Sequence, residues 1–327
     1  MVSHIAERTK SIEDFVSGHF QGKNEPMEPM LGDAGLRSYS RVASGGNSYI
    51  VMDCPPEYCS VQPFIDIAHY LRGNDFSAPE IIAQDVEQGF LILEDFGTLS
   101  VKEYLMRAKG LDPAERTRIY HLIIDLLILL QQQEPPTALK EFNDELLSSE
   151  LDIFVDWYIP YAYKKELKIH EFDEFIQLWK TALETKEPMA EGIVLRDYHV
   201  ENMMYLENRE GINQLGLLDF QDALFGSPIY DLVSVLEDAR VDIPKEEALE
   251  YIKYFAEKKE LDIEDTLLNY HILGAQRNSR ILGVFARKAE RDGDDSYLQY
   301  IPRVLKYLEQ DLSHPILAPI KNWLKKL

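Results

Sequence analysis

Cysteine is scarce in this chain. Among 327 residues only Cys54 and Cys59 occur, and four residues separate them. Two cysteines cannot cross-link a chain of this length into a disulfide scaffold, and a cysteine-based metal site would need further ligands at tighter spacing. We therefore expect both cysteines to be reduced and structural.

Positive charge is also in short supply. The chain has 34 Lys and Arg residues against 57 Asp and Glu residues, so its formal net charge is −23. Because phosphate backbones are bound through Lys and Arg, this composition argues against nonspecific nucleic-acid binding and against an anionic membrane surface. The charge would attract a cationic ligand, or it serves solubility alone.

Long hydrophobic runs are missing. The longest apolar stretch, residues 122–130, is interrupted by Asp125 and is far shorter than a membrane-spanning helix. The first 15 residues mix polar and charged side chains and lack the apolar core of a signal peptide. We expect a cytoplasmic protein without a membrane partner.

The first 96 residues favour a small sheet. An amphipathic pattern predicts a leading helix over 4–20 and another helix over 63–72. Short runs bounded by turn residues predict strands at 27–31, 38–43, 48–53, 80–86 and 90–94. Turns are expected at 32–35, 45–47 and 87–89. The pattern indicates a five-stranded antiparallel lobe.

The pattern changes after Gly97. Asp112 and Pro113 begin a long helix, and further helices are expected at 144–166, 171–186 and from 230 onward. Short β segments at 192–195, 203–206 and 214–219 interrupt them. We therefore predict an α+β fold with two lobes, 1–96 and 97–327, joined by a hinge near 94–98.

Two short segments of the second lobe carry candidate chemistry. Asp197 and Asn202 are five residues apart, and Asp219 follows 22 residues after Asp197. A hairpin between 203 and 218 would return Asp219 to the loop that holds the other two. Phosphoryl transfer needs a carboxylate that orients the attacking hydroxyl and oxygen ligands that hold magnesium. Taken singly, each of these residues is also typical of a turn cap.

The same segments resemble a known family. RDYHVENMMYL (196–206), GLLDFQDALFGSPIYDL (216–232) and GAQRNSRILGVF (274–285) are similar to the aminoglycoside phosphotransferase family, which has a protein-kinase-like fold. They are most similar to its bacterial subgroup of anomeric kinases for N-acetylmuramate and N-acetylglucosamine, which serve cell-wall recycling. The resemblance implies ATP and magnesium as cofactors and a small-molecule acceptor, an amino sugar phosphorylated at its anomeric hydroxyl.

The resemblance also implies roles for single residues. Asp197 would be the catalytic base, and Asn202 and Asp219 would hold magnesium. The first lobe would bind the nucleotide through Arg37, Ser38, Tyr39, Arg41, Glu94, Asp95 and Phe96, the last three at the hinge. Asp231 either braces the catalytic loop or is an acidic residue favoured at a helix start.

The sequence departs from the broader kinase pattern in two places. Position 195 is Leu where the general motif has His, and the third strand lacks the lysine that binds phosphates. Residues 32–35 do not form a G-x-G-x-x-G loop either. Arg37 and Arg41 are candidates to neutralise the phosphates, since a planar guanidinium donates bidentately. The alternative is that both are solvated arginines at the strand edge.

Three further residues are candidates for the acceptor site. His199 could contact substrate or assist proton movement, or it could bond within its own loop. Arg277 and Arg280, three residues apart on one predicted helix face, could meet an anionic substrate group.

Two other functions stay open at this point. One is a kinase for aminoglycosides or other hydroxyl compounds. The other is a catalytically silent kinase-like binding protein, which Leu195 and the missing lysine favour. The joint presence of Asp197, Asn202 and Asp219 argues against a silent protein, because a pure binder needs no such set.

Overall fold

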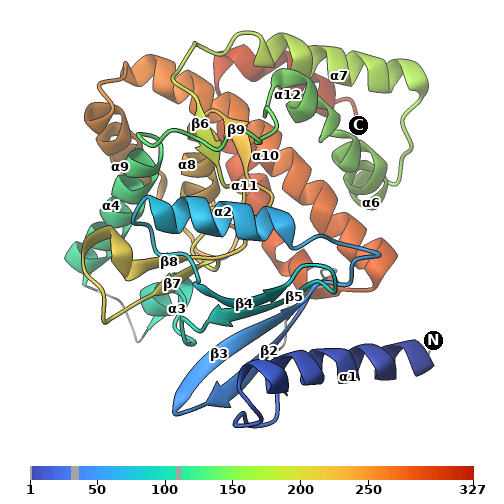
Figure 1. Cartoon of the computed structure of the whole chain (residues 1–327). Coiled ribbons are helices and arrows are strands. Elements are labelled where there is room, and N and C mark those ends of the chain that lie inside the picture. Colours follow the sequence, from blue (N-terminus) through green and yellow to red (C-terminus); the bar gives the residue numbers. More distant parts are fainter. Residues whose placement is uncertain (1, 31–36, 108–111) are drawn as a thin grey trace. The chain divides into compact units, whose positions relative to one another are not determined.

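The computed structural model describes residues 2–30, 37–107 and 112–327. It forms two compact units, Met1–Tyr104 with Asn202–Asp222, and Leu105–Glu201 with Ala223–Leu327. The described part has the expected α+β class, with a five-stranded antiparallel sheet in the first unit and mostly helices in the second (Figure 1). The turn expected at 32–35 lies outside the described residues.

The sheet of the first unit has the strand order β1-β2-β3-β5-β4. Its strands are β1 (Glu28–Pro29), β2 (Ser38–Ser44), β3 (Asn47–Asp53), β4 (Ile81–Asp85) and β5 (Phe90–Glu94). Tyr39 lies opposite Met52, which in turn lies opposite Leu91. At the other end of β3, Tyr49 lies opposite Glu94, where the expected hinge begins.

Both helices expected in the first unit are present, and α1 (Val2–His19) packs on the sheet. On α1, Ile12 and Val16 pack with Val51 and Phe90 of the sheet, which anchors the helix along it (Figure 1). Helix α2 (Gln62–Gly73) buries its own apolar face, including Phe64. The contacts of α1 hide apolar surface on the sheet from water.

A distant hairpin also belongs to the first unit. It consists of β7 (Met203–Tyr205), a 3₁₀ turn η2 (Gly211–Gln214) and β8 (Leu215–Leu217). The Leu217 N–H donates to the Ser77 carbonyl at 2.7 Å, and the Tyr205 N–H donates to the Leu99 carbonyl at 2.8 Å. The observed units therefore differ from the 1–96 and 97–327 lobes, because long-range hydrogen bonds attach 202–222 to the sheet unit.

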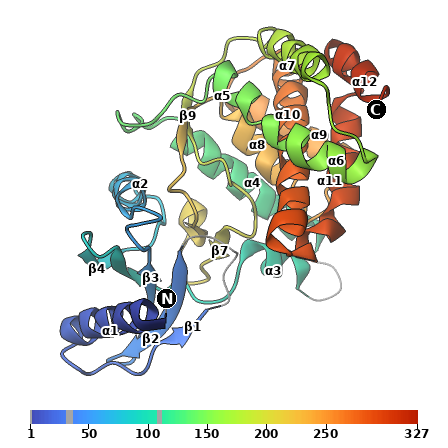
Figure 2. The same ribbon diagram turned by 90° about the vertical axis from the view of Figure 1, so that its right-hand side faces the viewer.

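The second unit is built around α10 (Ile263–Asp292), which packs against α8 (Ile229–Leu236), α11 (Ile301–Asp311) and the π-helical turn η1 (Phe154–Tyr158) (Figure 2). Its other helices are α4 (Pro113–Leu130), α5 (Asp144–Ser149), α6 (Ile159–Tyr163), α7 (Ile169–Leu183), α8 (Ile229–Leu236), α9 (Lys245–Lys258), α11 (Ile301–Asp311) and α12 (Ala318–Leu324). Short 3₁₀ turns η3 (Asp295–Tyr300) and η4 (Pro315–Leu317) join the last of them. None of the helices in the described ranges is long and apolar enough to cross a membrane.

Some elements differ from the sequence prediction. The single helix expected over 144–166 is wrong, because α5 ends at Ser149 and the π-helical turn η1 (Phe154–Tyr158) precedes α6. Pro160 has no N–H to donate to an ordinary helix ladder. Helix α3 (Val101–Met106) and strand β9 (Leu224–Gly226), which pairs with β6 (Gly192–Val194), were not anticipated.

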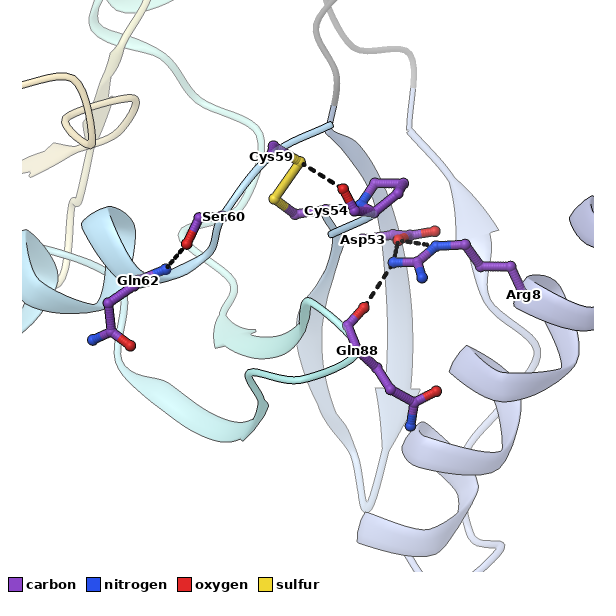
Figure 3. Close-up of a disulfide and its surroundings, with 8 residues drawn as sticks. Arg8, Asp53, Cys54, Cys59, Ser60, Gln62 and Gln88 are labelled. Carbon is purple, nitrogen blue, oxygen red and sulfur yellow. Dashed lines mark hydrogen bonds and ion pairs between the residues drawn. A yellow bond between two sulfur atoms is a disulfide. The ribbon is translucent and has the colours of Figure 1, made fainter. Parts of the chain in front are cut away.

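The two cysteines are paired. Cys54 and Cys59 form a disulfide across Cα atoms 5.7 Å apart, so the expectation of two reduced thiols is wrong (Figure 3). The Cys59 N–H donates to the Pro55 carbonyl at 3.0 Å, and this turn folds the loop back on itself. The Cα separation lies in the range that a disulfide requires, and the turn from Pro55 to Cys59 brings the two cysteines together.

Candidate active site

The first unit contains a cavity of about 940 Å³ that gathers most of the residues predicted to bind nucleotide and metal. Its walls include Arg37, Tyr39, Arg41, Glu94, Asp95, Phe96, Asn202 and Asp219. Ser38 lies elsewhere, on a second cavity of about 1080 Å³ beside α1. The space is large enough for a ligand of nucleotide size.

Asn202 and Asp219 meet at the base of the β7–β8 hairpin. The Asn202 carbonyl accepts the Leu218 N–H at 2.9 Å, and Asn202 Nδ2 lies 3.4 Å from Asp219 Oδ2. Gln221, which is 6% exposed, donates to Asp219 Oδ1 at 2.7 Å and to Asp222 Oδ2 at 3.3 Å. Gln221 and Asp222 were missed, although they directly follow the Asp-Phe pair in the sequence.

This donor set fits magnesium. No group of three or more His, Cys, Asp or Glu side chains suited to a metal occurs within 2–30, 37–107 and 112–327. Magnesium keeps several waters and binds through one or two carboxylates plus substrate phosphates, so it does not need an all-protein cage. Asp219 and the Asn202 amide provide oxygen ligands of that kind, and Gln221 holds the Asp219 carboxylate in place.

The two candidate phosphate-binding arginines differ in their surroundings. Arg41 Nε and Nη2 donate to the two oxygens of Asp95 at 2.7 Å and 3.1 Å. Burial would raise the pKa of Asp95, but hydrogen bonds from Arg41, Ser48 and the Gly97 N–H lower it overall. Asp95 therefore stays ionised, and its carboxylate already accepts hydrogen bonds from the Arg41 guanidinium.

The Arg37 Nε, by contrast, has no carboxylate partner of this kind among the described residues. This nitrogen is buried and donates to no acceptor in the described part of the chain. Burial raises the pKa of the neighbouring Tyr39 to about 12, while the charges of Arg37 and Asp219 act on Tyr39 in opposite directions. Arg37 and Asp219 thus both lie near Tyr39, on the cavity wall.

Arg209 and Gly216, from the β7–β8 segment, contact the side chains of Glu94 and Phe96 at the expected hinge. Arg209 donates to Ser77 Oγ at 2.8 Å, pairs with Glu94, and lies 5.1 Å from the Phe96 ring centroid. A Cβ on Gly216 would come within 2.7 Å of the Phe96 ring, so glycine is needed for this close packing. The β7–β8 hairpin therefore fixes the Glu94 and Phe96 side chains.

Asp197 belongs to the second unit, in a tightly turned loop. The Asp197 N–H donates to the Leu195 carbonyl at 2.8 Å, and the His199 N–H donates to the Asp197 carbonyl at 3.0 Å. Arg196 has a φ of 68°, a left-handed conformation that L-residues rarely adopt. The buried Tyr198 hydroxyl donates to the Ile123 carbonyl at 2.7 Å and anchors the loop to α4.

Asp231 makes the contacts that a bracing role requires. Its carboxylate accepts the N–H groups of Leu195 at 2.7 Å and Arg196 at 2.9 Å. Burial raises the pKa of Asp231 to about 7, against the opposing effect of those two hydrogen bonds and of Arg277, and Asp197 raises it further. The side chain that fixes the loop is thus itself sensitive to pH.

The candidate acceptor residues lie in the second unit. His199 is 6% exposed. Arg280 Nε lies 3.3 Å from Glu150 Oε2, and Arg196 also pairs with Glu150. Arg277 is buried on the same helix. Glu150 was missed, and no local sequence signal marks it, because its partners lie at least 46 residues away.

Comparison with known proteins identifies the family. A family model described as the phosphotransferase enzyme family (APH) matches residues 27–263. The chain belongs to the phosphotransferase enzyme family. Among its relatives within this family, an N-acetylmuramate/N-acetylglucosamine kinase of Caulobacter vibrioides is 33% identical, over 97% of this chain and 96% of the relative. A kinase of the same name from Pseudomonas aeruginosa is 31% identical, over 94% and 90%.

A solved structure of the phosphotransferase family agrees in fold. The aminoglycoside phosphotransferase APH(2'')-Ib, bound to ADP, superposes with a TM-score of 0.63 at 14% identity, covering 92% of this chain and 98% of that one. The kinase-like fold expected from the sequence is therefore confirmed. The family model and the relatives show that the chain is a phosphotransferase.

Proposed function

We propose that this phosphotransferase transfers the γ-phosphate of ATP to the anomeric hydroxyl of N-acetylmuramate or N-acetylglucosamine, a step of peptidoglycan recycling. The observation that carries the proposal is the 33% identity over 97% of the chain to a kinase named for both sugars. The nucleotide-sized cavity that holds Arg37, Asn202 and Asp219 supports ATP as the phosphate donor.

The residues have separate tasks in this proposal. Asp197 accepts the proton of the attacking hydroxyl, and Asp231 holds the Asp197 loop through the backbone of Leu195 and Arg196. Asn202 and Asp219 hold magnesium, which when bound offsets the negative charge of the phosphate oxygens. Arg37 donates to the phosphates in place of the strand lysine that this chain lacks.

Phosphorus NMR of the product tests the proposal. With ATP, magnesium and either sugar, we expect a phosphate signal that couples to the proton on the first carbon. The methyl glycoside of N-acetylglucosamine, which has no free anomeric hydroxyl, is the matched control and should not react. A phosphate on another carbon, or turnover of an aminoglycoside with none of either sugar, would overturn the assignment.

A further inference from the structure

A buried guanidinium lies on the central helix of the second unit. Arg277 on α10 is 4% exposed, and its Nε and Nη1 donate to no acceptor in the described ranges. Its guanidinium carbon lies 6.0 Å from the centroid of the Tyr230 ring. Removing such a charge from water is costly unless an anion or hydrogen-bond acceptors compensate it.

The acids of this region are already engaged by other groups. Arg196 and Arg280 share one carboxylate, Glu150. Both oxygens of Asp231 already accept backbone N–H groups. Burial lowers the pKa of Arg280, but Tyr230, Glu150 and Asp197 raise it overall, so this arginine stays charged.

Arg277 is thus the arginine of this region without a paired carboxylate among the described residues. We call Arg196, Arg277 and Arg280 with Glu150 the arginine cluster. Glu150 pairs with Arg196 and Arg280, whereas Asp231 and Asp197 act through their charge on Arg277 and Arg280. Such a site is unusual in a chain whose net charge is −23. The charge of Asp197, the proposed base, acts on both Arg280 and Asp231, so the cluster lies near the loop that would receive the acceptor hydroxyl.

We infer that Arg277, assisted by Arg280, binds a carboxylate of the acceptor and makes the enzyme prefer an acidic sugar. This inference rests on the proposed function and names the preferred acceptor as the lactyl-bearing N-acetylmuramate over neutral N-acetylglucosamine. A guanidinium suits a carboxylate because two parallel N–H groups can donate to its two oxygens.

A first test needs no variant. The wild-type enzyme is compared on N-acetylmuramate and on the methyl ester of its lactyl group, which has nearly the same shape but no charge. We expect kcat/KM to be roughly 10–100-fold higher for the acid, the size of one or two charge-assisted hydrogen bonds. Equal values for acid and ester would overturn the inference, even if both are phosphorylated.

A second test locates the effect. Arg277→Met should lose roughly 10–100-fold in kcat/KM for N-acetylmuramate, mainly through KM, and little for N-acetylglucosamine. Arg291→Gln is the control, because Arg291 is an exposed arginine paired with Asp292, fourteen residues or about 21 Å further along α10, and it should leave kcat/KM for both sugars unchanged. Equal loss on both sugars in Arg277→Met would show that Arg277 only balances Asp231, against the inference.

Calorimetry separates failure of the inference from failure of the proposed function. If wild-type enzyme phosphorylates neither sugar, the proposed function fails, and binding of N-acetylmuramate is then measured directly. Tighter binding of the acid than of its methyl ester, lost in Arg277→Met, would still support the carboxylate site. Absence of that difference would overturn it.

Discussion

The loop that carries Asp197 depends on single polar contacts rather than on regular structure. Arg196 is held with a positive φ, and two backbone N–H groups of the loop donate to Asp231. The Ser234 hydroxyl donates to the Arg196 carbonyl at 3.1 Å and adds a third attachment to α8. Such strain persists only where the surroundings hold it.

Asp197→Asn tests the catalytic base. The amide keeps the shape but cannot accept the hydroxyl proton, so we expect turnover to fall about 10²–10⁴-fold. Nucleotide affinity, measured by calorimetry, should stay near the wild-type value. Turnover within twofold of wild type would remove Asp197 from the mechanism.

Asp231 should make folding stability depend on pH. Its pKa is raised to about 7 in the folded chain, whereas an exposed Asp titrates near 4. Between these values the folded state holds more protons than the unfolded state, so Asp231 lowers the free energy of unfolding as pH rises, by up to about 1.4 kcal/mol per pH unit.

Denaturant titrations from pH 4 to 8 check this effect. Asp231→Asn will be less stable overall because an amide offers one acceptor oxygen instead of two. The difference in unfolding free energy between wild type and variant should nevertheless shrink from pH 4 to 7 and then level off. A constant difference would contradict the raised pKa.

The arginines of the cavity should respond differently to mutation. Arg37→Met should raise KM for ATP and leave the affinity for adenosine, which has no phosphates, unchanged. Arg41→Met should instead lower thermal stability, because it leaves the Asp95 carboxylate without its bidentate partner. Normal ATP kinetics in Arg37→Met would show that other groups hold the phosphates.

At the scale of elements, hydrogen bonds tie the start of the loop after β3 to the turn between β4 and β5. The Cys54 N–H donates to the Gly89 carbonyl at 2.9 Å, and a Cβ on Gly89 would lie 1.9 Å from the Cys54 carbonyl oxygen. Arg8 of α1 donates to Asp53 at 2.9 Å and to the Gln88 carbonyl at 2.9 Å, beside the disulfide (Figure 3). The disulfide therefore closes a loop that hydrogen bonds already place.

Closing this loop should stabilise the fold modestly. A disulfide that spans about six residues is worth about 2 kcal/mol on the chain-entropy account. Oxidised wild type should lose this amount on reduction with dithiothreitol, as a lower denaturant midpoint. The control is Cys59→Ser, whose denaturant midpoint should be the same with and without dithiothreitol. An unchanged denaturant midpoint of the wild type after reduction would argue against the disulfide.

At the scale of the whole molecule, the sheet unit is discontinuous in sequence. Residues 202–222 supply hydrogen bonds to Ser77 and Leu99, and the ring of Phe220 stacks on that of Phe64 with centroids 4.9 Å apart. Tyr205 likewise stacks on Tyr104, with centroids 3.9 Å apart. A fragment that ends near residue 104 lacks all of these contacts.

Fragments test this composition of the sheet unit. Residues 1–104 alone should show no cooperative thermal transition by circular dichroism, since apolar faces and carbonyls would be left uncovered. The same fragment joined to 202–222 by a short Gly/Ser linker should melt cooperatively. A sharp transition in 1–104 alone would contradict the role of the distant hairpin.

Much of this fold was predictable from local patterns. Alternating and helical hydrophobic periods with turn residues between them anticipated β2 to β5, α1, α2, α4 and the β7–β8 hairpin, because such signals act over a few residues. The motif around Asp197, Asn202 and Asp219 indicated phosphoryl transfer for the same reason. The helix over 144–166 failed where a π-helical turn and Pro160 break the period.

By itself, then, the sequence determined the α+β class, the phosphotransferase family and the candidate catalytic residues. Only the tertiary structure decided that Arg41 pairs with Asp95, that Arg196 and Arg280 share Glu150, and that 202–222 joins the sheet unit. These outcomes join residues 40 to 140 positions apart. Which charges meet depends on strand register and helix packing, which no local pattern of side chains specifies.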